Sequence, residues 1–321
     1  MRKLPLLAIA LFFVLVTSVL DSAHTAEGLS VAKGQPLYLA LGNSLAAGVG
    51  ASKPVQTGYV NLVFEHLQDT APYADTGITI LNLGVPGETS TSLLATGAQL
   101  EKALQEIDSR RSDQIQGNEV QVITIDIGGN DLIGLTQGGT PCRTDPSGPV
   151  CQQVVASTLT DFNTNFARIL TDLRRSAGPD ALILALTLYN PYSGTGGDLD
   201  ASGDLVVQQL NTTVQSVASR ADVDARVADI FPALQGKAPS LTHIGETPPD
   251  IHPNDDGYRL MADAVIAVLA SRVAPATAPV DLGGGGLLGS DDSPALYLGL
   301  LSAGAIVALG AVFLVWRRRS S

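Results

Sequence analysis

The stretch LYLALGNSLAAG (residues 37–48) joins an apolar run to a turn that contains a glycine and a serine. Residues 37–41 are apolar throughout, which predicts a short buried strand. Gly42, Asn43 and Ser44 follow at once. A serine in such a strand-to-helix turn, two positions after a glycine, presents its hydroxyl above the edge of a sheet. The alternative is that Ser44 only caps the following helix.

The same alternation of strand and helix continues along the chain. Further apolar runs predict strands at residues 78–83, 120–127, 181–188 and 226–230. Apolar residues recurring every three or four positions predict helices at residues 59–67, 93–107, 154–173, 205–218 and 258–269. Strand followed by helix, five times over, predicts a five-stranded parallel sheet covered on both faces. Right-handed crossovers favour a doubly wound, three-layer α/β/α sandwich, in which chemistry gathers at the carboxyl ends of the strands.

The two ends of the sequence predict a protein that is anchored in the cell membrane by a single span, with its globular domain on the outer side. Residues 1–26 begin with positively charged residues, continue with an apolar core and end with small and polar residues. This order is typical of a secretory signal peptide. The alternative is that the segment is not cleaved and serves as an N-terminal membrane anchor. Residues 295–316 carry no charge and would span ~33 Å as a helix, which predicts a single transmembrane span rather than a buried core helix. The basic tail, residues 317–321, is then cytoplasmic. Between these ends we expect a globular domain at residues 27–272 and a flexible Ala/Pro/Gly linker at residues 273–294.

The net charge limits which partners the protein can bind, and the cysteine content bears on the compartment in which it folds. The formal net charge is −12, which argues against nucleic acid as a partner. The only two cysteines, Cys142 and Cys151, lie in a Gly/Pro-rich segment. In an oxidising compartment we expect them to form a disulfide worth roughly 2–3 kcal/mol. A metal site would need more ligands than this pair offers.

Reactive residues are concentrated in four segments. These are the Ser44 turn, residues 82–89 (NLGVPGET), residues 126–131 (DIGGND) and residues 249–254 (PDIHPN). Acyl transfer needs a nucleophile, a base and donors for the oxyanion, and the four segments together hold all three. Of the four histidines, one lies in the predicted signal, one in a predicted helix and one in a loop. The fourth, His252, is therefore the best candidate base.

In this order, the four segments resemble the conserved blocks of the SGNH, or GDSL-type, hydrolases, and the resemblance covers residues 36–272. It implies that Ser44 is the nucleophile and His252 the general base. It also implies an oxyanion hole made by the backbone N–H groups of Ser44 and Gly87 and by the side-chain amide of Asn130. The fold implied is a flavodoxin-like α/β/α sandwich, and the activity is cleavage of carboxylic esters and some thioesters without a metal or other cofactor.

Two positions depart from the family pattern. Asn43 stands where the family usually carries Asp, and we expect tolerance because Asn keeps the shape and the hydrogen bonding. The family's acid stands three residues before the histidine, where this chain has Pro249. Asp250 is only two residues before His252, but side chains two apart share a face of an extended segment. We therefore predict that Asp250 orients Nδ1 of His252; the rival is a backbone carbonyl, which would give a Ser–His dyad.

Two further patterns could mark a functional site, but each also has an interpretation without a function. Residues 198–205 (DLDASGDL) resemble the start of a calcium loop, but Gln209 replaces the bidentate Glu expected at position twelve, and Gly/Asp clusters are common in turns. Residues 211–213 (NTT) form a glycosylation sequon, which matters only in a host that glycosylates.

Three functions remain open at this point. The first is an extracytoplasmic serine esterase acting on lipid or small acyl esters, the second a cell-envelope polysaccharide O-deacetylase, and the third a non-catalytic surface module on the same fold. We expect the loop between Cys142 and Cys151 to line the acyl or leaving-group pocket, because it follows Asn130 directly. The composition of that loop does not indicate a chain length.

Overall fold

The structure is a computed structural model that describes residues 34–136 and 139–273. The predicted signal peptide, the linker beyond residue 273, the predicted transmembrane span at residues 295–316 and the basic tail lie outside the described residues. Within the described ranges, no helix is both long and apolar enough to cross a membrane. These ranges all belong to one compact unit of the chain, Met1–Pro275.

A five-stranded parallel sheet forms the centre of the fold, as predicted. The strand order is β2-β1-β3-β4-β5, the order of a doubly wound sheet in which the chain reverses its direction of winding after β2. Every strand overlaps its predicted run, with ends that differ by at most two residues. The strands are β1 (Leu37–Gly42), β2 (Thr79–Asn82), β3 (Val120–Asp126), β4 (Leu182–Leu186) and β5 (Arg226–Ala228).

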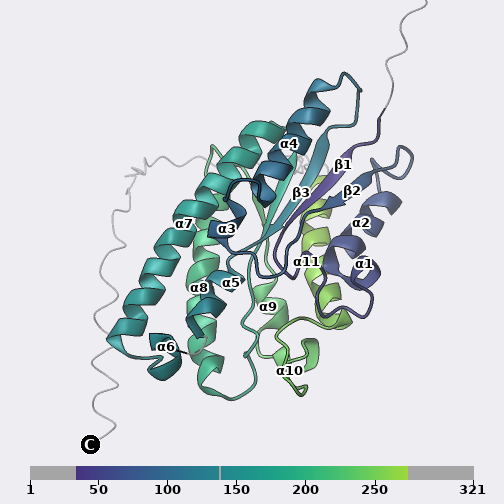
Figure 1. Cartoon of the computed structure of the whole chain (residues 1–321). Helices are drawn as coiled ribbons and strands as arrows, with labels where there is room; N and C mark the ends of the chain where they lie inside the picture. Colours follow the sequence, from purple (N-terminus) through teal and green to yellow (C-terminus); the bar gives the residue numbers. More distant parts are fainter. Residues whose placement is uncertain (1–33, 137–138, 274–321) are drawn as a thin grey trace, which may run out of the picture. The chain divides into compact units, whose positions relative to one another are not determined.

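Helices cover both faces of the sheet, which makes the three-layer sandwich (Figure 1). One face packs against α4 (Gln99–Ser112), α7 (Pro149–Ala177) and α8 (Asp198–Ala218). The other packs against α2 (Tyr59–Asp69) and α11 (Asp255–Val273).

Strand β1 shows why both faces are apolar. Its residues are all buried, and they alternate between the two helical layers because successive side chains of a strand point to opposite faces. Leu39 and Leu41 belong to the core on the α7 side, whereas Tyr38 and Ala40 belong to the core on the α11 side. This explains why the predicted strands read as continuous apolar runs.

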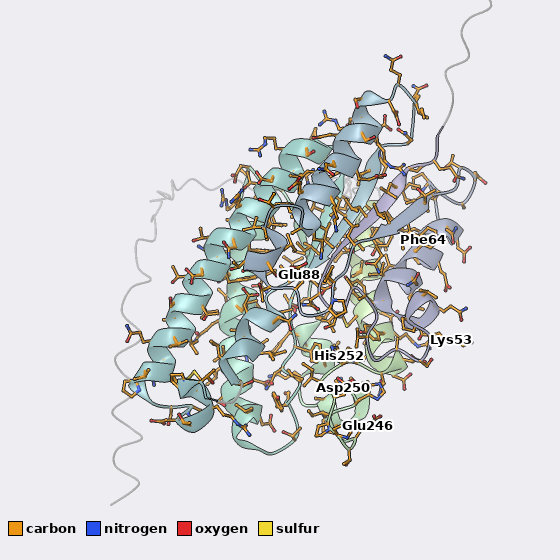
Figure 2. The ribbon with its side chains drawn as sticks, in the orientation of Figure 1. Lys53, Phe64, Glu88, Glu246, Asp250 and His252 are labelled. Atoms are coloured by element: carbon orange, nitrogen blue, oxygen red, sulfur yellow. A yellow bond between two sulfur atoms is a disulfide. The ribbon has the colours of Figure 1, made fainter. Side chains whose placement is uncertain are left out.

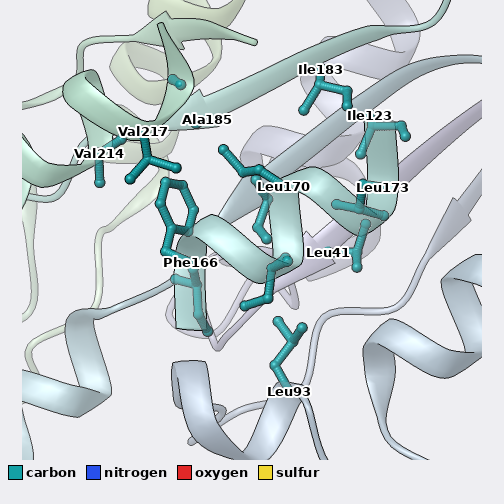
Figure 3. Close-up of a cluster of buried hydrophobic side chains, with 14 of the residues drawn as sticks. Leu41, Leu93, Ile123, Phe166, Leu170, Leu173, Ile183, Ala185, Val214 and Val217 are labelled. Atoms are coloured by element: carbon teal, nitrogen blue, oxygen red, sulfur yellow. The ribbon is translucent and has the colours of Figure 1, made fainter. Parts of the chain in front are cut away.

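The larger of the two cores is built around α7. Figure 3 shows Phe166, Leu170 and Leu173 of this helix beside residues of the sheet, among them Ile123 and Ile183. All five side chains have at most 1% of their surface exposed. Burying a large apolar side chain contributes about 1.5–3 kcal/mol, so this layer holds the sheet edge that carries the functional segments.

Local turn chemistry shifts several helix bounds from the prediction. The predicted helix at residues 93–107 is two helices, α3 (Ser90–Leu93) and α4, because Gly97 takes a left-handed conformation at φ +73° between them. Helix α3 starts early because Thr89 and Ser92 form a reciprocal capping box. Helices α7 and α8 begin five and seven residues before the predicted starts at 154 and 205.

Short helices complete the connections between these elements. They are α1 (Pro54–Thr57), α5 (Gly129–Ile133), the 3-10 helix η1 (Gly134–Thr136), α6 (Pro141–Thr144), α9 (Phe231–Leu234) and α10 (Ala238–Leu241).

Candidate active site

Ser44 lies in a tight turn directly after β1, at the carboxyl edge of the sheet. Gly42 ends the strand at φ +144°, and a Cβ at this position would lie 2.5 Å from the carbonyl oxygen of Asp126. Only glycine therefore fits where β1 passes β3. The next residue, Asn43, fixes the turn, since its Oδ1 accepts a hydrogen bond of 2.9 Å from the N–H of Leu45. Asn43 thus makes a local hydrogen bond that an aspartate would also make, as expected for this departure from the family pattern.

A buried carboxylate lies beneath the Ser44 turn, and the sequence analysis gave it no role. Asp126, the last residue of β3, has no exposed surface. Its Oδ1 accepts from the N–H of Asn43 at 3.1 Å, and its Oδ2 accepts from the hydroxyl of Tyr59 at 2.6 Å. Burial raises the pKa of the Asp126 carboxyl to about 7, although hydrogen bonds from Tyr59 and from the backbone of Asn43 and Ala46 act to lower it. An acidic residue near the end of a predicted buried strand was the signal available in the sequence.

The end of β2 and the segment that follows it are tied to the Ser44 turn by hydrogen bonds. The side-chain amide of Asn82 donates to the carbonyl oxygen of Ala46 at 2.7 Å, and the N–H of Val85 donates to that of Gly42 at 3.1 Å. Gly87 follows in an exposed turn at φ +84°. A Cβ on Gly87 would meet no atom within 4 Å, so the position favours glycine through its backbone angle and not through lack of space.

Asn130 lies in the first turn of α5, after β3, and points its amide toward the same segment. Its Nδ2 donates to the carbonyl oxygen of Glu88 at 2.9 Å. Because a side-chain amide has two N–H donors, this bond fixes the orientation of Asn130 and leaves a second donor. Asn130 and the predicted oxyanion donor Gly87 are in this way connected through the neighbouring residue Glu88.

His252 and Asp250 form a close pair in the segment between α10 and α11 (Figure 2). Oδ1 of Asp250 lies 2.5 Å from Nδ1 of His252 and also accepts from the backbone N–H of His252 at 3.1 Å. The carboxylate, and not a backbone carbonyl, is therefore the partner of Nδ1 in this structure. Partial burial acts to raise the pKa of Asp250, but the hydrogen bonds from His252 outweigh it and hold the pKa below its usual value.

The segment that carries His252 is anchored from three sides. The hydroxyl of Tyr189 donates to the carbonyl oxygen of Ile251 at 2.7 Å, and the N–H of His243 donates to that of His252 at 3.0 Å. Nε2 of His243 lies 2.8 Å from the carbonyl oxygen of Gly50, on the loop that follows Ser44. A Cβ on Gly50 would come within 2.8 Å of Cβ of His252, so the two loops are in direct contact.

The structure brings three of the predicted residues to one cavity. Ser44, Asn130 and His252 line a pocket of about 50 Å³ at the carboxyl edge of the sheet. Tyr189, which the sequence analysis missed, lines the same pocket. It directly follows the predicted strand at residues 181–188, so a search of all the predicted strand ends would have found it. Gly87 is not among the lining residues of this pocket.

The predicted disulfide between Cys142 and Cys151 is confirmed. It joins α6 to the first turn of α7, so the segment that looked like a loop is largely helical. Both cysteines are buried, and both line a second cavity of about 150 Å³. The segment thus lines a cavity, and the assignment of that cavity to the acyl or leaving group stays a prediction.

The two remaining sequence patterns have structural explanations. Residues 198–205 form the start of α8 rather than a loop, and the carboxylate of Asp200 accepts hydrogen bonds from the N–H groups of Gly194 and Gly196. In residues 34–136 and 139–273, no group of three or more His, Cys, Asp or Glu side chains could hold a metal ion. In the sequon, Asn211 is only 5% exposed and hydrogen-bonds both the N–H and the carbonyl oxygen of Leu188.

Comparison with known proteins supports the fold and the prediction of ester hydrolysis. The model of the GDSL-like Lipase/Acylhydrolase family matches residues 40–260. Among solved structures, the lipase Lip_vut3 from a goat rumen metagenome is 20% identical with a TM-score of 0.54, and the match covers 73% of this chain and 97% of the lipase. The extracellular lipase from Streptomyces rimosus is 19% identical with a TM-score of 0.52, covering 74% of this chain and 99% of the lipase. No match was found among curated proteins.

Proposed function

The chain belongs to the GDSL-like lipase/acylhydrolase family and is an ester hydrolase, and from this premise we propose that it cleaves carboxylic esters through an acyl-enzyme formed on Ser44. His252 serves as the general base and Asp250 as the acid that orients it. The non-catalytic alternative does not fit a family of ester hydrolases.

The contact between Asp250 and His252 is the observation that carries this proposal. The sequence left a displaced acid and a backbone carbonyl as rival partners for Nδ1, and the carboxylate lies 2.5 Å from that nitrogen. A carboxylate at Nδ1 holds the imidazole in the tautomer that leaves Nε2 free to accept a proton. Ser44 and His252 line one cavity, which supports the pairing of this nucleophile with this base.

Each residue then has a defined step in the reaction. Oγ of Ser44 attacks the ester carbonyl carbon while Nε2 of His252 takes the hydroxyl proton. The carbonyl oxygen becomes an oxyanion, and the N–H groups of Ser44, Gly87 and Asn130 stabilise it. His252 passes its proton to the departing alcohol, and a water molecule then repeats the sequence to release the acid. Asp250 stays ionised throughout and stabilises the imidazolium, which agrees with its lowered pKa.

The enzyme works, we propose, outside the cytoplasm, held at the cell membrane by a single span at residues 295–316. The sequence features of residues 1–26 and 295–319 support this location. The disulfide between Cys142 and Cys151 supports it independently, because disulfides persist mainly in oxidising compartments.

Replacing the nucleophile tests the function directly. Ser44→Ala should abolish hydrolysis of 4-nitrophenyl esters, with a loss on the order of 10⁶-fold in turnover, and should prevent labelling by a fluorophosphonate probe. Ser157→Ala, at an exposed position on α7, is the matched control and should retain both. Thermal unfolding should change little in either variant. Activity of Ser44→Ala within tenfold of wild type would exclude Ser44 as the nucleophile.

A further inference from the structure

We propose that the second cavity is the acyl-chain site and that it makes the enzyme selective for medium-chain esters of about six acyl carbons. This inference rests on the proposed function, because it assigns the acyl group of the same reaction. It goes further in naming the substrate class and the residues that select it.

The two cavities are adjacent. The catalytic pocket and the larger cavity share five lining residues, so the same side chains border both cavities. These shared residues are Gly129, Ile133, Leu188, Tyr189 and Pro191. Gly129 directly precedes Asn130, so the larger cavity opens beside the proposed oxyanion donor.

The lining of the larger cavity is suited to a hydrocarbon chain. Beyond the shared residues, most of the lining consists of aliphatic side chains of α5, η1, α7 and α8 and of the disulfide, and no lining residue in the described part of the chain is Asp, Glu, Lys, Arg or His. The polar lining side chains are those of Thr136, Asn190, Tyr192 and Ser202, and the amide of Asn190 already donates to the carbonyl oxygens of Leu199 and Asp200. A sugar ring would bring several hydroxyl groups that need hydrogen-bond partners. The aliphatic members include Leu132, Val155, Leu199, Val206 and Val207.

The volume of the cavity sets the chain length. It is about 150 Å³, and an apolar cavity of about that size in another protein holds one benzene molecule, which has six carbons. Each methylene that leaves water for such a site should raise kcat/KM by about fourfold. Hexanoate has four more methylenes than acetate, so its advantage should be on the order of 10²-fold, with no further gain once the cavity is full.

Tyr189 gives the cavity a fixed relation to the catalytic base. Tyr189 lines both cavities. Its hydroxyl donates a hydrogen bond to the carbonyl oxygen of Ile251, the residue before His252. Asn211 holds the neighbouring Leu188 through two backbone hydrogen bonds. These hydrogen bonds hold Leu188 and Tyr189 in place between the catalytic pocket and the larger cavity.

The experiment measures kcat/KM for 4-nitrophenyl esters from acetate to palmitate, in wild type and in two variants of α8. Val206 is half-buried and lines the cavity, whereas its neighbour Leu205 is 63% exposed and does not. Val206→Phe should lower kcat/KM for hexanoate at least tenfold while leaving acetate within twofold. Leu205→Phe adds an aromatic ring on the same helix and should leave both values unchanged. If Val206→Phe does not fold, as judged by its thermal transition, Val155→Phe fills the cavity from α7 instead.

Several results would overturn the acyl assignment. Equal kcat/KM for all chain lengths, or an equal loss for acetate and hexanoate in Val206→Phe, would show that the cavity does not hold the acyl chain. A dependence on alcohol length in a series of alkyl acetates, removed by Val206→Phe, would assign the cavity to the leaving group. Higher kcat/KM on acetylated xylan than on hexanoate would favour the deacetylase. All of these results leave ester hydrolysis at Ser44 intact, whereas failure to cleave any ester would refute the proposed function itself.

Discussion

The buried carboxylate beneath the nucleophile turn predicts an unusual dependence of stability on pH. The pKa of Asp126 is about 7 in the folded protein, against 3.8 for an ordinary aspartate. Between these two values the folded protein holds a proton that the unfolded chain releases. Because the folded state then binds more protons, the free energy of unfolding falls as pH rises from about 4 to about 7. An aspartate with a lowered pKa, such as Asp250, has the opposite effect.

The size of this effect follows from the shift. An interval of about three pH units, at about 1.4 kcal/mol per unit, amounts to about 4 kcal/mol lost by pH 7. Asp126→Asn mimics the protonated acid: its Oδ1 can still accept from the N–H of Asn43, and its amide N–H can donate to the hydroxyl oxygen of Tyr59. We therefore expect the variant to match wild type near pH 4 and to be more stable by a few kcal/mol at pH 8.

Urea unfolding of the purified domain at pH 4, 5, 6, 7 and 8 measures this difference. Subtracting the Asp126→Asn curve from the wild-type curve removes the contributions of the other titrating groups. The remainder should slope by about 1.4 kcal/mol per pH unit between pH 4 and 7. Asp161→Asn, at an exposed position on α7, is the control and should run parallel to wild type. A difference curve for Asp126→Asn that is flat across this range would refute the reasoning.

Three further predictions concern the site. Asp250→Asn should lower turnover by about 10⁴-fold, nearly as much as His252→Ala, because the imidazole loses its tautomer; a loss of tenfold or less, measured with the same 4-nitrophenyl ester, would indicate a dyad. Asn130→Ala should lower kcat by about 10²–10³-fold with KM little changed, since one oxyanion donor is worth about 2.7–4 kcal/mol in the transition state; a rise in KM with kcat intact would contradict that role. Reduction of the Cys142–Cys151 disulfide should lower the ratio of hexanoate to acetate hydrolysis several-fold and cost about 2–3 kcal/mol in stability; an unchanged ratio after complete reduction, verified by thiol titration, would separate the disulfide from the pocket.

Much of the fold was predictable because its central sheet is simple. Parallel strands buried on both faces give continuous apolar runs, so the five strands were found within two residues at each end. The Ser44 turn and the His252 segment were recognisable from short motifs at strand ends. The position of Asp250 was predictable too, since two residues of extended chain bring a carboxylate back to the same face.

The features that the sequence analysis did not predict depend on contacts between segments that are distant in the sequence. Asp126 and Tyr59 are 67 residues apart, and neither has a local pattern that reveals the hydrogen bond between them. Tyr189 acts through the carbonyl oxygen of Ile251, 62 residues away. The start of α8 was missed because its first residues, rich in Asp and Gly, have weak helix propensity. Hydrogen bonds from the preceding loop nevertheless hold Leu199, Asp200 and Asp204. Local pattern alone does not contain this information.

The burial of Asn211 has a practical consequence for producing the enzyme. A eukaryotic secretory host attaches glycans to Asn-x-Thr sequons while the chain is still entering the lumen, before it folds. A glycan on Asn211 would occupy the amide that donates to Leu188 and would have no room between α8 and the end of β4. Material from such a host would divide into unmodified, active enzyme and modified chains that do not fold. Removing the acceptor by Asn211→Gln would disturb the fold, because the longer side chain displaces the two hydrogen bonds that hold Leu188. Thr213→Ala removes the sequon at less cost, because the side chain of Thr213 makes a hydrogen bond of 3.4 Å within its own helix, to the carbonyl oxygen of Gln209. In a bacterial host that does not glycosylate the sequon, neither substitution is needed.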